Sequence, residues 1–445
     1  MKTVPQLKRF FIALLLILLL SAGGTAAADQ LPIVFVHGNG DWAALWSTTI
    51  WRFESNGYDP DRLFAVNMAN PSAPGDDTKA EENRSSTIDQ AAQLASFVTR
   101  TLLTTGADKV ILVGSSRGGN TIRNYVKFAG GYASTALAVL CGTPNHGVYA
   151  APVALNSEWN GMGNFLARLN AVSEVHPAVQ FVTTRSDKND KYAQPTGEFI
   201  GRPGKPTSID HKGPELRGAL NITLPGLDHR EVAFHKSAFS EIFQVITGRA
   251  PAKLDIVPQD NPVINGMISG SVNGSYSNLP LAGAQVEVYA VDSNTGERAT
   301  GALLTVTTGA DGMWGPLNAN PAAYYEFVVN ADGYPITRFY LTPFPRSSKY
   351  IHFRLSPLPD GHKEAGADVT LYRPRGYLGH GRDTFLIDGM VPEGVNPGVP
   401  GTESATTTYP VGTSSAVKVV LNEEAVTVKV NPADKNHKII ALFHY

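Results

Sequence analysis

The first half of the chain alternates short apolar runs with amphipathic stretches, and this alternation restricts the fold more than any other feature of the sequence. Strands joined through helices run parallel, because each crossover returns the chain to the same edge of the sheet. Residues 30–248 therefore predict an α/β fold with a parallel sheet covered on both faces. The expected strands are residues 31–36, 63–68, 110–113, 137–141 and 180–183, and the expected helices are residues 88–102, 120–128 and 237–247.

The second half of the chain has a different pattern, with many short alternating runs separated by Gly, Pro, Asn and Asp. This pattern predicts an all-β, sandwich-like region that follows a proline-containing linker at residues 249–262. We expect the α/β domain to span residues 29–250, a β-sandwich to span residues 262–358 and a C-terminal β domain to span residues 359–445. The sequence leaves open whether the last two form one unit.

The N-terminus has the pattern of a secretory signal. Three basic residues precede an apolar run over residues 10–20, and small residues then lead to Ala28. That run is shorter than the roughly 20 residues that span a bilayer, so we expect no transmembrane anchor. Residues 1–28 therefore predict a secreted protein, extracellular or periplasmic, that is cleaved after Ala28.

Charge and cysteine content exclude several classes of protein. Lys and Arg total 37 against 39 for Asp and Glu, a net charge of -2, so nucleic acid is not an expected partner. Cys141 is the single cysteine, so no intramolecular disulfide can form and an apolar core must stabilise the fold. No H-E-x-x-H motif and no phosphate loop with its lysine occurs, so neither a catalytic metal nor a cofactor is expected, and the sequence leaves a structural calcium ion open. The oligomeric state stays open.

Residues 114–118 read Gly-Ser-Ser-Arg-Gly and fit the pattern G-x-S-x-G. The motif leaves an expected strand and enters an expected helix, which is the context that a nucleophilic serine requires. A tight turn between strand and helix aims the Ser116 hydroxyl out of the sheet. The alternative is an ordinary turn with an idle serine, and the strand and helix around the motif favour the nucleophile.

The loop after the first strand, residues 37–41, is placed to supply a second backbone N–H to the same point. Such loops form oxyanion holes. We expect the amides of Asn39 and Arg117 to stabilise an oxyanion. His37 more often has a structural role at such a position, through hydrogen bonds to the loop.

A nucleophilic serine needs a base, and the base needs an acid that orients it. His229 lies late in the domain on a loop before the last helix, and we favour it over His235, which is closer to that helix. Two carboxylates follow the strand that ends near residue 183. Spacing alone does not choose between Asp187 and Asp190.

These segments together resemble the α/β-hydrolase superfamily, and within it secreted microbial lipases and esterases. Residues 34–38 are similar to the oxyanion strand of that group, residues 113–119 to its nucleophile elbow, and residues 141–147 to its G-T-P-x-x-G segment. The acid loop of relatives has an Asp ahead of Gln-Pro in the frame found at residues 190–195. The resemblance thus implies Asp190 as the acid, with Asp187 in reserve. Arg117 departs from the usual Met or Gln.

The β region has its own resemblance. Residues 279–289, 310–315 and 325–327 are similar to carboxypeptidase-regulatory, transthyretin-like sandwich modules. Some microbial lipases, archaeal ones among them, resemble this order of a hydrolase domain followed by β domains. The resemblance leaves open whether the β part shapes the acyl groove, binds a surface or only stabilises the fold.

Two apolar features favour a substrate with a hydrophobic acyl chain. Trp42 and Trp46 are four residues apart beside the oxyanion loop, so a helix would place both on one face. Residues 148–175 form an apolar insertion, containing Phe165 and Leu166, that can serve as a lid. A buried core stripe and a buried helix are the alternatives. We predict these four side chains as substrate-binding residues.

The sequence therefore predicts a carboxylic ester hydrolase, a lipase or esterase with Ser116, His229 and Asp190 as its catalytic residues. A hydrophobic ester or a lipid interface is the expected partner. An extracellular aliphatic polyester depolymerase would use the same three residues with a more open site. An exported binding protein with an inactive hydrolase domain is a third hypothesis, and the intact set of three residues argues against it.

Overall fold

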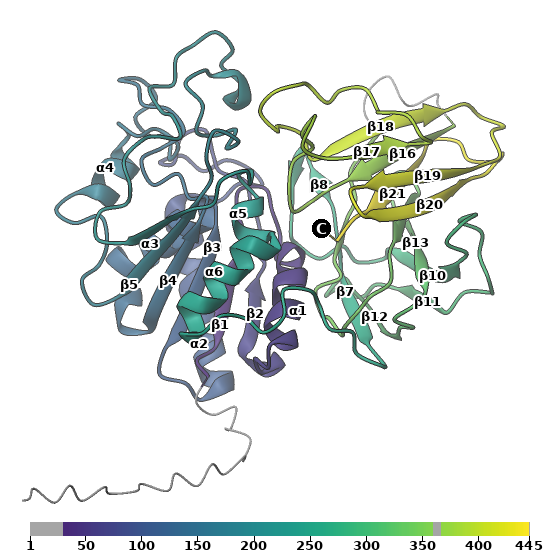
Figure 1. The fold of residues 1–445 in the computed structure, drawn as a ribbon, viewed down its shortest axis with the longest axis horizontal. Coiled ribbons are helices and arrows are strands. Elements are labelled where there is room, and N and C mark those ends of the chain that lie inside the picture. Colours follow the sequence, from purple (N-terminus) through teal and green to yellow (C-terminus); the bar gives the residue numbers. More distant parts are fainter. Residues whose placement is uncertain (1–29, 359–365, 445) are drawn as a thin grey trace, which may run out of the picture.

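The computed structural model describes residues 30–358 and 366–444, so the signal sequence expected at residues 1–28 lies outside the described residues. The N-terminal part contains a six-stranded parallel sheet with strand order β2-β1-β3-β4-β5-β6 (Figure 1). Its strands are β1 (Ile33–Val36), β2 (Leu63–Val66), β3 (Val110–Ser115), β4 (Thr135–Cys141), β5 (Gln180–Arg185) and β6 (Leu220–Thr223). The parallel sheet is confirmed. The sequence pattern did not indicate β6, because this edge strand has no buried residue.

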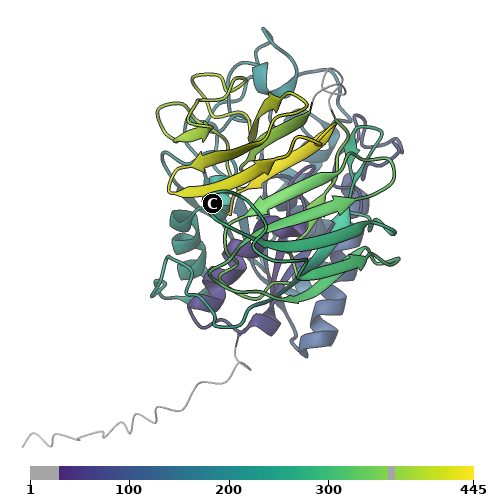
Figure 2. The same cartoon turned by 90° about the vertical axis from the view of Figure 1, so that its right-hand side faces the viewer.

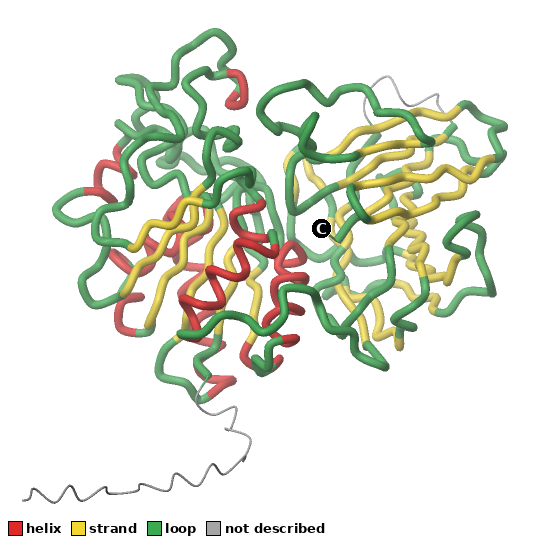
Figure 3. The backbone as a smooth tube through the Cα atoms, viewed as in Figure 1, coloured by secondary structure: helices red, strands yellow, loops and turns green. Residues whose placement is uncertain are grey.

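Helices cover both faces of the sheet (Figure 3). They are α1 (Ser47–Ser55), α2 (Thr87–Thr105), α3 (Arg117–Phe128), α4 (Asn164–Asn170), α5 (Glu231–Phe234) and α6 (Lys236–Thr247). Successive strand side chains point to opposite faces, so Ile33 and Phe35 of β1 join a core with α1, α5 and α6. Val34 and Val36 join a second core with α2 and α3. No helix in residues 30–358 and 366–444 is both long and apolar enough to cross a membrane.

Helix α2 shows how local sequence sets its ends. Ser86 caps the first turn, and its side chain and that of Asp89 accept hydrogen bonds from each other's backbone N–H groups. The helix ends at Gly106, which has a φ of 66° that a glycine adopts without a steric penalty. Both ends of the helix are thus set by residues within or next to it.

The second part of the chain is a β region, as predicted. Its largest sheet has seven strands in the order β11-β10-β13-β14-β21-β16-β18, and smaller sheets have the orders β12-β7-β15, β17-β19-β20 and β8-β9. The strands are β7 (Val263–Ser269), β8 (Ser271–Val272), β9 (Ser275–Tyr276), β10 (Gln285–Val291), β11 (Leu304–Thr307), β12 (Met313–Asn318), β13 (Tyr324–Asn330), β14 (Thr337–Leu341), β15 (Phe353–Arg354), β16 (Ala367–Tyr372), β17 (Phe385–Ile387), β18 (Ser404–Tyr409), β19 (Ser415–Leu421), β20 (Glu424–Val430) and β21 (His437–Leu442).

The seven-stranded sheet crosses the boundary that we expected at residue 358. The last strand, β21, lies between β14 and β16 and pairs in parallel with both. Strands from residues 262–358 and from residues 359–445 therefore share one continuous set of hydrogen bonds. The seven-stranded sheet thus joins the two ranges that we expected to be separate domains.

The β region packs against the α1 side of the α/β part (Figures 1 and 2). The side chain of Trp51, on α1, is fully buried in the core of the β region. Its indole Nε1 donates to the carbonyl of Ser347 at 2.9 Å. From the β region, the Tyr350 hydroxyl accepts the backbone N–H of Ala65 at 2.9 Å, at the sheet itself. The two parts thus share apolar core as well as hydrogen bonds.

Candidate active site

Ser116 occupies a sharp turn between β3 and α3. Its φ of 52° and ψ of -121° lie outside the regions that residues other than glycine usually adopt, a strain that typically costs about 1–3 kcal/mol. The turn is compact because a Cβ on Gly118 would lie 2.6 Å from the carbonyl oxygens of Val36 and His37. Gly118 thus lets α3 approach the end of β1, and the turn directs the serine out of the sheet.

Three side chains that the sequence singled out lie in one chain of hydrogen bonds. The Nε2 atom of His229 is 2.9 Å from the hydroxyl of Ser116, and its Nδ1 atom is 3.0 Å from a carboxylate oxygen of Asp190. The ring of Tyr192 meets the His229 ring edge to face, with centroids 4.6 Å apart. His229 is 3% exposed, so its packing restricts the ring to one orientation.

The alternative base and acid lie in other environments. The ring of His235 caps α6 by accepting the backbone N–H of Ser237, and burial lowers its pKa to about 4. The Asp187 carboxylate accepts backbone N–H groups of Asn189 and Gly226. Among the described contacts, neither residue bonds to the hydroxyl of Ser116 or to the ring of His229.

The loop expected to form an oxyanion hole lies beside the serine. A Cβ on Gly38 would be 3.1 Å from the Cβ of Ser116, and Asn39 lines the same cavity as Ser116. The Asn39 side chain accepts the backbone N–H of Ala73 at 2.8 Å, which holds the loop. Arg117 is the first residue of α3, so its backbone N–H belongs to the helix N-terminus, where N–H groups have no helical partner.

His37 is buried under this loop and is bonded to backbone on both sides. Its Nδ1 lies 2.9 Å from the carbonyl of Gly38, and its Nε2 accepts the N–H of Met68 at 3.0 Å. Burial lowers the pKa of His37 to about 3. The ring is therefore neutral over the physiological range, and it supports the loop in the way we expected.

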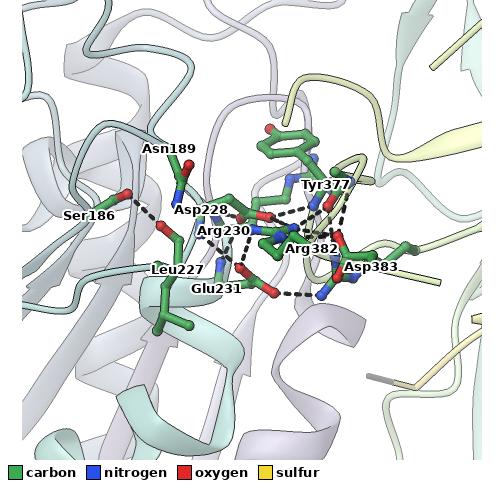
Figure 4. A network of polar contacts seen from close by, with 12 residues as sticks. Ser186, Asn189, Leu227, Asp228, Arg230, Glu231, Tyr377, Arg382 and Asp383 are labelled. Carbon is green, nitrogen blue, oxygen red and sulfur yellow. Dashed lines mark hydrogen bonds and ion pairs between the residues drawn. The ribbon is translucent and has the colours of Figure 1, made fainter. Parts of the chain in front are cut away.

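A cavity of about 230 Å³ opens beside Ser116. Its lining includes six aromatic or aliphatic side chains, Val148, Tyr149, Trp159, Tyr192, Ile200 and Tyr377. Tyr377 comes from the β region and is labelled in Figure 4. Val148, Tyr149 and Trp159 lie in the insertion that the sequence pointed to. No local pattern distinguishes Tyr192, Ile200 and Tyr377, because segments far apart in the chain form this part of the wall.

The four predicted substrate-binding residues, Trp42, Trp46, Phe165 and Leu166, are not among the residues that line this cavity. Trp46 is fully buried in the core, with its ring 4.9 Å from that of Phe35. Trp42 precedes a short 3-10 helix, so the two tryptophans do not share the face of an α-helix. Phe165 and Leu166 are buried in α4, in a small cluster of their own. Their apolar character serves packing.

The insertion of residues 148–175 is held to the turn of Ser116 by a buried ion pair. The Arg117 guanidinium binds both carboxylate oxygens of Glu158, at 2.6 and 2.8 Å. It also donates to the carbonyls of Pro71 and Ser85. The unusual arginine at this position thus fixes the wall of the cavity, a contact that a short apolar residue could not make.

The described residues contain no group of three or more His, Cys, Asp or Glu side chains that could hold a metal ion. The neighbouring Cys141 is fully buried, and burial raises the pKa of its thiol to about 12.

Two segments of the chain match known protein families. Residues 30–162 match the family described as Lipase (class 2), and residues 264–358 match the Lipase C-terminal domain. These matches confirm the resemblance to lipases of the α/β-hydrolase fold. No curated protein matches the chain.

Several solved structures are also similar to this chain. For a Bacillus licheniformis lipase in its mature form, the identity is 20%, the match covers 49% of this chain and 92% of that one, and the TM-score is 0.35. For the propeptide form of that lipase, the identity is 14%, the match covers 90% of this chain and 92% of that one, and the TM-score is 0.37. For a Paleococcus ferrophilus monoacylglycerol lipase, the identity is 13%, the match covers 49% of this chain and 94% of that one, and the TM-score is 0.32.

Proposed function

We propose that this chain, a carboxylic ester hydrolase with an α/β-hydrolase domain, cleaves esters of hydrophobic acyl chains through an acyl-enzyme on Ser116. One observation carries the proposal. Asp190, His229 and Ser116 are joined by hydrogen bonds of 3.0 and 2.9 Å, and Ser116 opens into a cavity with aromatic walls. This arrangement supports a nucleophile, its base and the group that orients the base.

The reaction follows from these positions. The Ser116 hydroxyl attacks the ester carbonyl carbon while its proton passes to Nε2 of His229. The tetrahedral intermediate then collapses, the bond to the alcohol oxygen breaks, and His229 gives its proton to that oxygen. A water molecule repeats the sequence on the acyl-enzyme, and it releases the carboxylic acid and restores Ser116. Asp190 accepts the Nδ1–H of His229 throughout and stabilises the imidazolium.

The backbone amides of Asn39 and Arg117 are the proposed oxyanion donors. Negative charge develops on the carbonyl oxygen in the transition state, and donors fixed by the fold stabilise it without rearrangement. Arg117 lies at the N-terminus of α3, where the helix dipole adds to this effect. Loss of one such donor typically costs about 3–4 kcal/mol of barrier.

The cavity supports a hydrophobic acyl chain of limited length. Its volume of about 230 Å³ is below the roughly 300–1,000 Å³ typical of sites for drug-sized ligands. We therefore expect hydrolysis rates to be higher for short acyl chains than for long ones. Trp159→Ala removes part of the wall and should move this preference to longer chains. A profile over p-nitrophenyl esters measures both.

The test of the chemistry is the loss of turnover on Ser116→Ala. We expect kcat to fall at least about 10⁴-fold, with loss of covalent labelling by a fluorophosphonate. Ser237→Ala, an exposed serine on α6, is the matched control and should keep both properties. Ester hydrolysis that persists in Ser116→Ala would show that another group carries the reaction.

We also propose that the enzyme acts outside the cytoplasm, in the periplasm or the medium. The support is the basic and apolar pattern of residues 1–28. When the full chain is expressed in a bacterial host, N-terminal sequencing of the exported protein should begin at Asp29. Retention of the full-length chain in the cytoplasm would contradict this localisation.

A further inference from the structure

The β region contacts each of the loops that carry the proposed catalytic groups. Arg354 donates to the carbonyls of Gly40 and Asp41 in the oxyanion loop, at 2.7 and 3.0 Å. Lys191, next to Asp190, donates to the carbonyl of Gly401 at 2.8 Å. The third contact is at the loop of His229. It consists of ion pairs between side chains of the β region and two buried carboxylates, one on each side of His229 in the sequence.

His229 lies inside a turn that its two acidic neighbours close. The backbone N–H of Asp228 donates to the Glu231 carboxylate at 2.8 Å, and the N–H of Glu231 donates to the Asp228 carboxylate at 3.0 Å. These reciprocal bonds have the form of a capping box, and they span His229. A shift of either carboxylate would therefore also move the backbone of His229.

Those carboxylates are in turn bound by the β region (Figure 4). One Arg382 nitrogen lies 2.8 Å from Glu231 and the other lies 3.1 Å from Asp228, so a single guanidinium bridges the turn. The backbone N–H of Tyr377 donates to Asp228 at 2.7 Å, and Arg373 binds the remaining oxygen of Glu231. Between them these groups contact both ends of the turn.

Charge explains why the turn needs a cation. Asp228 is fully buried and Glu231 is 6% exposed, so little water screens their repulsion. Burial and the charge of Asp228 raise the pKa of Glu231 to about 7. Burial also opposes ionisation of Asp228, yet Arg382 and Arg373 hold its pKa below the usual range. Without Arg382, the guanidinium that bridges the two carboxylates would be lost, and their repulsion beside His229 would increase.

We propose that Arg382 is a positioning residue for His229, so that the β region sets the geometry of the proposed catalytic site. This inference rests on the proposed role of His229. The hydrogen bond from His229 to Ser116 is 2.9 Å long, and a displacement of about 1 Å in such a site typically costs about 10²-fold in rate. Arg382 does not contact the cavity beside Ser116, so substrate binding is not expected to change.

The experiment compares Arg382→Gln with the wild type in the full chain. We expect kcat to fall about 10- to 100-fold while KM changes less than about twofold. Loss of this positive charge near His229 should also favour the protonated imidazole, so the acid limb of kcat/KM should move to higher pH by roughly half a unit. A purely structural loss of folded protein would lower activity at all pH values equally.

Arg346→Gln is the matched control. Arg346 also joins the two parts of the chain through an ion pair, with Glu54 at 2.7 Å, and its side chain is 18% exposed against 23% for Arg382. Its described hydrogen bonds go to Glu54 and Val257 and not to the turn of His229, so Arg346→Gln should leave kcat and the pH profile as they are. Equal effects of the two variants would overturn the positioning role.

Two further variants keep the inference falsifiable. Glu231→Gln added to Arg382→Gln removes the repulsion, and it should return the acid limb and recover part of kcat. If Arg382→Gln does not fold, Arg382→Lys keeps the charge but not the bridge. For Arg382→Lys, a lower kcat together with an unchanged acid limb of the pH profile supports the inference, and an unchanged kcat overturns it. Unchanged labelling of Ser116→Ala would instead refute the proposed function.

Discussion

Replacement of Arg117 by Met should destabilise the α/β part strongly while it keeps the backbone N–H that the proposed oxyanion hole uses. The side chains of Arg117 and Glu158 are 4% and 3% exposed, so the variant leaves a carboxylate buried without its cation. The carbonyls of Pro71 and Ser85 lose their donors as well. Met fills similar space with apolar atoms, so a cavity is not the main effect.

Loss of one partner of a buried ion pair typically costs about 3–5 kcal/mol. In a folded unit of this size, about 1 kcal/mol shifts Tm by roughly 2–4 °C, so we expect a fall of about 6–20 °C. Burial raises the pKa of Glu158, and loss of Arg117 raises it further. A carboxyl whose folded pKa is raised loses stability as pH rises through that value, so the deficit should be larger at pH 8 than at pH 5.

Thermal unfolding followed by circular dichroism at both pH values measures this effect. Glu158→Gln and the double variant complete the cycle, and the double variant should be at least about 1.5 kcal/mol more stable than the sum of the single effects implies. Effects that add within about 0.5 kcal/mol, or a deficit that does not depend on pH, would refute the idea that the ion pair holds residues 148–175 to the turn of Ser116.

Three more predictions concern burial elsewhere in the chain. Cys141 should react with a thiol reagent such as DTNB only after unfolding, since its thiol is buried and burial raises its pKa to about 12; rapid reaction of the native protein would contradict the described core. Trp51→Ala should cost about 3–5 kcal/mol and separate the unfolding of the β region from that of the α/β part in calorimetry, and a single transition at the wild-type Tm would argue against a shared core. Burial lowers the pKa of His352 to about 3, and its Nδ1 accepts the N–H of Met267. A histidine whose pKa is lowered in the folded state stabilises the fold above pH 6.5, and this stabilisation is lost as the pH falls. Between pH 7 and pH 5, the unfolding free energy of His352→Gln should therefore fall by about 2 kcal/mol less than that of the wild type. Urea titrations at both pH values measure this, and an equal fall in the two proteins would contradict it.

The sequence by itself determined the parallel sheet and the order of groups around Ser116. Periodicity and turn residues act over a few residues, so the strand before Ser116 and the helix at residues 88–102 could be predicted without tertiary contacts. Spacing could not separate Asp187 from Asp190, because they are three residues apart in one loop. The fold separates them, since only one carboxylate reaches the ring of His229 in the described contacts while the other holds the N–H of Gly226.

Only the tertiary structure decided which apolar side chains form the cavity and which groups hold the loop of His229 in place. An apolar residue lowers the free energy equally well in a core or in a cavity wall, so Trp46 and Trp159 cannot be told apart by hydrophobicity. Tyr377 and Arg382 reach the site because the β region packs on the α/β part. Contacts across about 150 residues depend on the whole fold, and no local pattern records them.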